Sequence, residues 1–260
     1  MILGIDTATA ATAAAVWGPD GPAVEARDDP EPGARPAHAT RLLALVEEAL
    51  EGASAGWDDV ERIAVGIGPG GFTGLRHGIA TARGLAQARE LPLVGVSSLE
   101  ALARGAAGWA AAGGDGVAAE GGRQAGPSRG PEGGASRGAV CDDVAPVLAV
   151  VDARRGEVFA AAWRGAERLL EPVAIAPADL AARIAAGPLA APLAAGDGAV
   201  RFREQLERAG ALVPADRSPV HRISALQVCR IGAVGEAAGR DGLVPDYRRE
   251  PDAALPKPHC

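Results

Sequence analysis

Residues 3–17 carry the sequence LGIDTATAATAAAVW, in which two short hydrophobic runs flank a polar bend. The first run ends on Asp6, and the second ends on Trp17. Two such runs joined by a few polar residues predict a β-hairpin, with Asp6, Thr7 and Thr9 at its bend. The hairpin therefore presents a carboxylate and two hydroxyl groups at the end of an otherwise hydrophobic strand.

The same pattern returns in residues 145–165, APVLAVVDARRGEVFAAAWRG. Asp152 ends a hydrophobic run there, and Trp163 follows it at the spacing that separates Trp17 from Asp6. In each half a helix and a further strand with a glycine turn come after the hairpin. We therefore predict an α/β fold built from two related βαβ halves; a chance match of two short segments is the alternative.

Helical and strand-like patterns alternate outside the two hairpins. Residues 37–51 place apolar side chains on one helical face. Residues 63–67 and 93–96 are strand-like, and between them Thr73 is expected to cap a helix. A last helix is predicted over residues 223–239, where it is expected to cross back and support the first half.

These patterns divide the chain into four expected segments. They are a first lobe (1–103), a glycine-rich disordered insertion (104–143), a second lobe (144–221) and a C-terminal helix with a Pro-rich tail (222–260). The glycine-rich stretch itself ends at about residue 138, and its glycines lack the three-residue period of collagen. We expect it to contribute little to a hydrophobic core.

The composition excludes several classes of function. The only lysine is Lys257, so a phosphate-binding Walker A lysine is absent. The net charge of −7 makes the chain a poor primary ligand for nucleic acid. Three widely spaced cysteines, no secretory signal and no long apolar run lead us to expect a cytoplasmic protein without a membrane anchor.

Two interpretations of the hairpin loops stay open. Carboxylates and hydroxyl groups of Asp6, Thr7, Thr9 and Asp152 could order a hydrated Mg²⁺ and contact the phosphates of a nucleotide. Alternatively, the same side chains only close tight turns through bonds to the backbone. The one candidate for an adenosine-binding turn, AAGDGA at residues 194–199, is short, and an ordinary turn after a strand explains it as well.

The run GPGGFTGLRHG, residues 68–78, opens a helix with small residues at every fourth position. This row consists of Gly74, Gly78, Ala82 and Ala86. Such a row allows close approach, either of the sheet inside the chain or of a helix from another chain. The four histidines show no ligand spacing, so we expect no metal site.

Several of these stretches together resemble the TsaB family. They are LGIDTAT at the first hairpin, HATRLL at 38–43, GIGPGGFTGLRHGIATARGLA at 66–86 followed by PLVGVSSLEALA, DARRGEVF at 152–159 and PDYRRE at 245–250. The resemblance covers nearly the whole chain apart from the glycine-rich insertion. It implies a two-lobed actin-like ATPase fold, the fold of sugar kinases, Hsp70 and actin.

The resemblance also implies a function without catalysis. Members of the family pair with TsaD, a homologous transferase that modifies N6 of adenosine 37 in tRNAs reading ANN codons, and an ATPase, TsaE, joins them. The implied partner interface, which also makes homodimers, comprises His38, Leu42, Leu45, Gly74, Arg76, Gly78 and Ala82. Asp6, Thr7, Thr9 and Asp152 would be vestigial phosphate loops. The chain would have no cofactor of its own, while the complex uses ATP and threonylcarbamoyl-AMP. The tRNA would be contacted mainly through the complex.

Two other functions are carried as alternatives. The first is an active ATP-dependent small-molecule kinase of the same superfamily, in which Asp6 or Asp152 would organise Mg²⁺. The second is a peptidase, which the sequence disfavours because it shows neither a nucleophile–base pair nor metal ligands.

Overall fold

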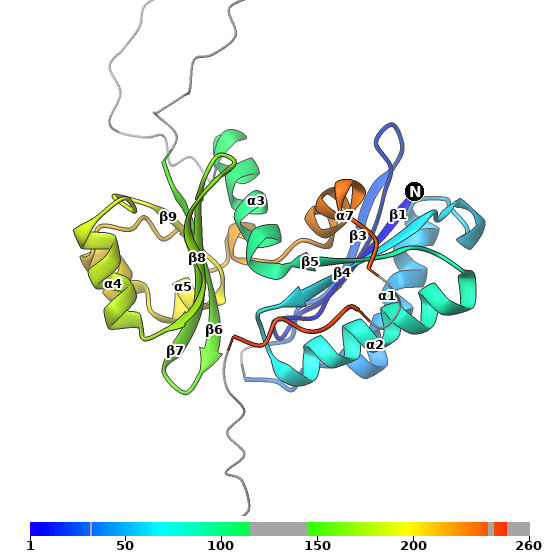
Figure 1. Ribbon diagram of the computed structural model, residues 1–260, viewed down its shortest axis with the longest axis horizontal. Coiled ribbons are helices and arrows are strands. Elements are labelled where there is room, and N and C mark those ends of the chain that lie inside the picture. Colours follow the sequence, from blue (N-terminus) through cyan, green and yellow to red (C-terminus); the bar gives the residue numbers. More distant parts are fainter. Residues whose placement is uncertain (32, 115–144, 239–241, 249–260) are drawn as a thin grey trace, which may run out of the picture.

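The computed structural model describes residues 1–31, 33–114, 145–238 and 242–248, and these residues form two β-sheets with helices around them (Figure 1). The first sheet consists of β1 (Ile2–Asp6), β2 (Thr12–Trp17), β3 (Ala23–Asp28), β4 (Arg62–Gly68) and β5 (Leu93–Ser97). Its strand order is β3-β2-β1-β4-β5. The first three strands pair antiparallel, whereas β4 and β5 run parallel to β1.

The second sheet has the same arrangement with one strand fewer. It consists of β6 (Val147–Arg154), β7 (Glu157–Arg164), β8 (Glu167–Ile175) and β9 (Leu193–Ala195), in the order β8-β7-β6-β9. An antiparallel hairpin again pairs on one side with a third strand and on the other with a parallel strand. The predicted α/β class and the predicted repeat of hairpin and parallel strand are therefore confirmed.

The two hairpins have nearly the same register. Trp17 lies opposite Ile2 at the open end of the first hairpin, and Trp163 lies opposite Val147 in the second. Asp6 is the last residue of β1, whereas β6 continues two residues past Asp152 to Arg154. The second hairpin therefore closes later and has a tighter turn than the first.

Helices α1 (His38–Gly52) and α2 (Phe72–Arg89) cover one face of the first sheet. The alternation of a strand sends Leu3 and Ile5 toward this face, where they pack with Leu45 and other buried side chains of both helices. Helix α2 begins at Phe72, one residue before the expected cap Thr73, and Gly71 at its N-cap provides no side-chain hydrogen bond.

Helices α3 (Ser98–Ala111) and α7 (Ala225–Val234) lie on the opposite face of the first sheet (Figure 1). Helix α3 also packs against β6 and β7, so one continuous hydrophobic core joins the two sheets. Helix α7 rests on β1, β2 and β4, and it is shorter than the helix expected over 223–239.

The expected start of the glycine-rich insertion at residue 104 is wrong. Helix α3 continues through Arg104 and Gly105 to Ala111, because Ala103 and Ala106 are buried in the core that joins the sheets. Burial of this helix face thus outweighs the low helix propensity of its glycines. Most of the expected insertion, residues 115–144, lies outside the described residues, as do Lys257 and His259.

The remaining elements surround the second sheet and connect it to α7. They are α4 (Pro177–Ala186), α5 (Asp197–Arg201), α6 (Arg203–Arg208) and the short 3₁₀ turn η2 (Pro219–His221). A second 3₁₀ turn, η1 (Trp57–Asp59), belongs to the first half and connects α1 to β4. Across the described part of the chain, no helix combines the length and the apolar character needed to cross a lipid bilayer.

Candidate functional site: a cleft between the two hairpins

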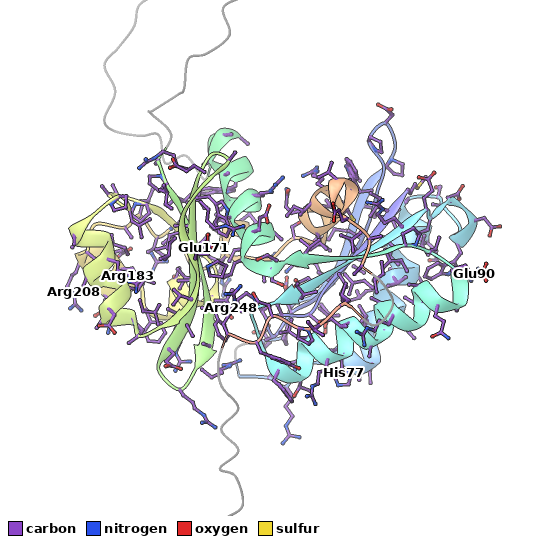
Figure 2. All side chains as sticks on the ribbon, viewed as in Figure 1. His77, Glu90, Glu171, Arg183, Arg208 and Arg248 are labelled. Atoms are coloured by element: carbon purple, nitrogen blue, oxygen red, sulfur yellow. The ribbon has the colours of Figure 1, made fainter. Side chains whose placement is uncertain are left out.

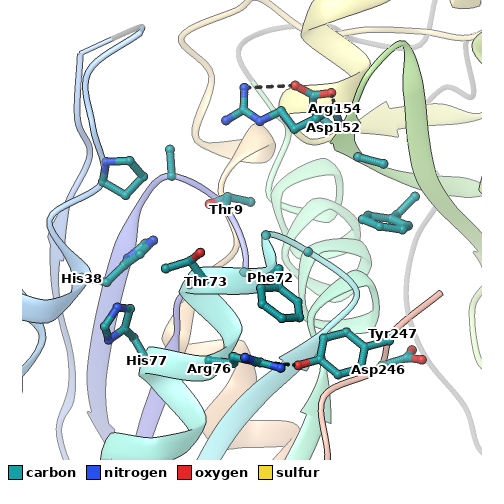
Figure 3. Close-up of a pocket in the computed structure, with 18 of the residues that line it drawn as sticks. Thr9, His38, Phe72, Thr73, Arg76, His77, Asp152, Arg154, Asp246 and Tyr247 are labelled. Atoms are coloured by element: carbon teal, nitrogen blue, oxygen red, sulfur yellow. Dashed lines mark hydrogen bonds and ion pairs between the residues drawn. The ribbon is translucent and has the colours of Figure 1, made fainter. Parts of the chain in front are cut away.

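A cleft of about 1300 Å³ opens between the loop ends of the two sheets (Figure 3). One wall comes from the β1–β2 loop, the β4–α2 turn and the first turns of α1 and α2. The β6–β7 turn forms the opposite wall, and residues 246–248 close one end. The fold thus brings the two loops that the sequence singled out to the same cleft.

Asp6 is turned away from this cleft and buried, with 3% of its surface exposed. Its Oδ1 accepts a hydrogen bond from the backbone N–H of Ala8 at 2.9 Å, and its Oδ2 accepts one from the Ser98 hydroxyl at 2.7 Å. Burial raises the pKa of this carboxyl above its ordinary value, while the two hydrogen bonds act in the opposite direction. Asp6 therefore ties the end of β1 to the start of α3.

Thr7 is also used inside the chain. Its side chain is fully buried, and its hydroxyl donates to the carbonyl of Gly74 at 2.8 Å. A Cβ on Gly74 would overlap the Thr7 carbonyl oxygen, and a Cβ on Gly78 would overlap the Thr7 hydroxyl oxygen. The absence of side chains at Gly74 and Gly78 therefore allows α2 to lie close to the β1–β2 loop.

Thr9 and His38 lie on the wall of the cleft (Figure 3). The Nδ1 atom of His38 lies 2.8 Å from the hydroxyl oxygen of Thr12, so the first residue of α1 is held against the hairpin. Burial lowers the pKa of His38, and the neighbouring His77 lowers it further. Among the four expected phosphate-loop residues of this chain, Thr9 and Asp152 line the cleft, whereas Asp6 and Thr7 do not.

Asp152 lies on the opposite wall, and positive charges already neutralise it. Its Oδ2 is 2.6 Å from Nη1 of Arg201 and 3.4 Å from Nη1 of Arg154. Its Oδ1 accepts the backbone N–H of Arg154 at 2.9 Å. The side chain is only 7% exposed, so these partners occupy most of its capacity to accept hydrogen bonds.

The candidate adenosine turn at 194–199 supports the second sheet instead of lining the cleft. Gly196 has a φ of 112°, and a Cβ there would overlap the carbonyl oxygen of Val150. The Asp197 side chain accepts the backbone N–H of Asp152 at 3.0 Å, and burial raises its pKa. The simpler interpretation, an ordinary turn at the end of a strand, explains these contacts.

These contacts decide whether a Mg²⁺-bound nucleotide fits. The two carboxylates that the fold class would use for the metal are engaged by a serine hydroxyl and by two guanidinium groups. No group of three or more His, Cys, Asp or Glu side chains in the described ranges could hold a metal ion. The oxygen donors of the two loops therefore do not fit a Mg²⁺–nucleotide site.

Most residues of the expected partner interface are buried within the chain. Leu42, Leu45 and Ala82 are buried against the sheet of this chain, because the apolar face of each helix is its inner face, and Gly78 is buried against Thr7 of the β1–β2 loop. His38 and Gly74 are buried as well, and only Arg76 of the seven residues is exposed. The outer face of the two helices instead presents Thr40, Leu43, His77, Ala80 and Gly84.

Other residues of the cleft were missed in the sequence. Phe72 stacks against the guanidinium of Arg76, with 3.8 Å between Arg76 Cζ and the ring centroid. The centroid of the Phe72 ring lies 5.5 Å from that of the Tyr247 ring. Arg76 also donates to the Tyr247 hydroxyl at 3.1 Å. The two arginines before a hairpin glycine, Arg154 and Arg155, could have been recognised in the sequence as cleft residues. The contact between Arg76 and Tyr247 could not, because 171 residues separate the two.

Comparison with known proteins identifies the class and then the family. A structure titled YeaZ from Pseudomonas aeruginosa aligns with a TM-score of 0.65 and 25% identity, over 95% of this chain and 98% of that one. A family model described as TsaD, tRNA N6-adenosine threonylcarbamoyltransferase, matches residues 30–123. With its mixed sheets, the protein is therefore an α/β protein of the actin-like ATPase class.

Sequence relatives narrow the class. The tRNA threonylcarbamoyladenosine biosynthesis protein TsaB of Escherichia coli is 37% identical over 163 residues, which are 63% of this chain and 54% of that protein. An uncharacterized protein of Mycobacterium tuberculosis H37Rv is 31% identical over 257 residues, 97% of this chain and 93% of the relative. This chain belongs to the TsaB family. It spans about half the length of the E. coli relative that it matches.

Proposed function

We propose that this chain is a non-catalytic subunit that pairs with and activates a TsaD transferase for N6-threonylcarbamoylation of adenosine in tRNA. The observation that carries the proposal is the internal engagement of both loop carboxylates, in a chain of the TsaB family. A fold of the actin-like class whose two loop carboxylates hold the protein together keeps the scaffold of a nucleotide enzyme without its metal ligands. In this view the two sheets correspond to the two lobes of that fold.

The outer face of α1 and α2 is the surface we assign to the partner. The two helices pack side by side (Figure 1), and Leu43 is 55% exposed on the outer side of α1. Gly84 on α2 has open space where a Cβ would lie. An exposed leucine beside small residues allows a helix of another protein to pack closely.

Activation in this proposal is structural. A subunit shifts the conformation of its partner only by the difference in its affinity for the partner's states. We propose that the chain needs no cofactor of its own, that the complex supplies ATP and threonylcarbamoyl-AMP, and that it acts in the cytoplasm with TsaE. The same face would serve a homodimer when the transferase is absent.

Reconstitution tests the proposal. The chain is combined with the cognate TsaD, TsaE and threonylcarbamoyl-AMP synthase, and tRNA modification is measured with and without it. Leu43→Glu should abolish pairing in gel filtration and reduce modification. Val234→Glu, at a site that is 84% exposed on α7 and therefore on the other face of the sheet, should change neither. Equal modification in the absence of the chain would refute the proposed function.

The kinase alternative is tested by the same protein in isolation. Titration with Mg·ATP should release no heat of binding, because neither Asp6 nor Asp152 is available to a metal. Micromolar binding that disappears in Asp152→Asn would instead favour the alternative.

A further inference from the structure

The charge of the cleft is opposite to that of the chain. The whole chain carries a net charge of −7, yet five arginines line the cleft against two aspartates. The arginines are Arg35, Arg76, Arg154, Arg155 and Arg248. Both aspartates are paired, Asp152 with Arg201 and Arg154 and Asp246 with Arg248. A concave surface with this excess of cations concentrates positive potential and attracts polyanions.

The β6–β7 turn holds two of these arginines in an unusual backbone conformation. Arg154 and Arg155 have φ values of 65° and 53°, in the left-handed region that favours Gly, Asn or Asp. The turn closes with Arg155 and Gly156 between the paired residues Arg154 and Glu157. Arginine at positions that Asn would fill with less strain indicates that the side chains are needed at the cleft.

Aromatic rings stand on the other wall. Phe72 and Tyr247 are 54% and 48% exposed, although large apolar side chains are normally buried. Arg76 lies against the Phe72 ring and donates to the Tyr247 hydroxyl, which fixes the two rings relative to each other (Figure 3). Ordered, half-exposed rings beside arginine are the type of platform on which bases of single-stranded nucleic acid stack.

The size and lining of the cleft suit a chain better than a single small molecule. Its volume of about 1300 Å³ exceeds the range of about 300–1,000 Å³ usual for small-ligand pockets. Small residues contribute to both walls, Ala8, Ala10, Gly70 and Gly71 to one and Ala153 to the other. These small side chains leave room for an extended backbone between the arginines.

We propose that this cleft binds a single-stranded segment of RNA, with phosphates against Arg35 and Arg155 and a base on the Phe72–Tyr247 platform. The identity of that RNA as tRNA rests on the proposed function. The chain is then a direct RNA-contacting subunit of the complex, although its net charge alone argues against nucleic-acid binding. An acidic peptide would match the charge but leaves the exposed aromatic pair without a role.

The test measures tRNA affinity of the complex with TsaD by fluorescence anisotropy across a range of salt concentrations. The double variant Arg35→Glu/Arg155→Glu should bind more weakly, and the slope of log affinity against log salt should fall by about two. Phe72→Ala should weaken binding about tenfold with an unchanged salt slope, because it removes stacking and no charge.

Matched controls separate local from general effects. Arg183→Glu/Arg208→Glu changes the net charge equally at exposed sites far from Arg248 and the cleft (Figure 2), and it should retain wild-type affinity and slope. Leu212→Ala removes an apolar side chain that is 48% exposed outside the cleft, and it should also bind normally. Wild-type affinity in the cleft double variant overturns the proposal.

Two further outcomes are informative. If a polyglutamate peptide competes with RNA at equal charge and Phe72→Ala affects neither ligand, the cleft is a groove for acidic peptides and the proposal is wrong. Pairing with TsaD is followed in the same samples by gel filtration. If the wild-type chain does not pair with TsaD but still binds tRNA through Arg35 and Arg155, the proposed function is refuted. The RNA site is then retained.

Discussion

Single contacts decide what the β1–β2 loop and the small-residue row of α2 do. The hydroxyl of Thr7 donates to Gly74, and the absence of a side chain at Gly78 leaves room for that hydroxyl. The sequence correctly predicted that the row permits close approach and left open what approaches. It could not decide between the sheet and a partner, because helical periodicity is the same for either neighbour.

Gly78→Ala should destabilise the protein, whereas Gly84→Ala on the same helix should stabilise it. A Cβ at Gly78 would overlap Thr7, and overpacking of this kind costs about 1–3 kcal/mol. At Gly84 nothing lies within contact range, so alanine gains about 0.5–1 kcal/mol of helix propensity. Urea unfolding measures both free energies of unfolding. Equal effects of the two substitutions would show that close contact with Thr7 does not exclude a side chain at Gly78.

The stability of the fold should decrease in mild acid because of His221. Its Nδ1 accepts the backbone N–H of Gly196 at 3.2 Å, and its Nε2 lies 3.1 Å from the Pro214 carbonyl oxygen, an arrangement that requires the neutral ring. Burial lowers the pKa of His221, and Arg203 lowers it further. The contribution is complete above the ordinary pKa of 6.5 and is lost as the pH falls through the lowered value.

Unfolding free energies at neutral pH and at about pH 5 measure this loss. In His221→Gln the difference between the two pH values should be smaller than in the wild type. It should not vanish, because burial also lowers the pKa of His38. An unchanged pH dependence in the variant would mean that other groups account for it.

At the scale of elements, the return of α7 to the first sheet depends on β3. The carboxylate of Glu25 accepts hydrogen bonds from the Ser224 hydroxyl and from the backbone N–H of Leu226, in the first turn of α7. Arg27 bonds to Glu25 and to the carbonyl of Ile223. An acidic group at a helix N-terminus is favourable, and here it comes from a strand 199 residues away.

Glu25→Ala should therefore cost about 1–3 kcal/mol of unfolding free energy, because it leaves partly buried donors and the Arg27 cation without this partner. Glu171→Ala removes a carboxylate that is 77% exposed and paired to Arg168, and it should cost less than about 1 kcal/mol. Chemical denaturation of both variants provides the comparison. Similar losses would indicate that the Glu25 contacts add nothing beyond a surface ion pair.

Elements were predicted well where periodicity is strong, and poorly where distant residues decide. The hairpins, the helix over 37–51 and the strands beside it follow from local pattern. The extension of α3 through Gly105 and Gly108 does not, because residues of the second sheet bury its inner face. The position of Tyr247 beside Phe72 and Arg76 was invisible for the same reason, since Tyr247 lies 171 residues after Arg76.

At the scale of the molecule, α3 makes the two sheets one cooperative unit. Leu102 on α3 is fully buried, and its side chain reaches the turn at Gly196 in the second sheet while α3 also packs on β4 and β5. A core shared across both sheets links their stability. The two halves recognised in the sequence therefore have similar strand patterns, and they share one hydrophobic core.

Leu102→Ala should lower the stability of both halves together, by about 2–5 kcal/mol. Circular dichroism and tryptophan fluorescence should follow one coincident unfolding transition in the wild type and in the variant. Two separate transitions in either protein would show that the sheets unfold independently and that α3 does not couple them.

The placement of α7 has a consequence for how the protein is made. Helix α7 covers β1, β2 and β4, and Gly232 and Cys229 fit directly against Ala64 and Gly4 of the first sheet. The strands of that sheet emerge from the ribosome first, whereas α7 follows more than a hundred residues later. At about 5–20 residues per second the nascent chain exposes an apolar sheet face for on the order of ten seconds. During that interval the uncovered face is the kind of surface that chaperones shield from aggregation.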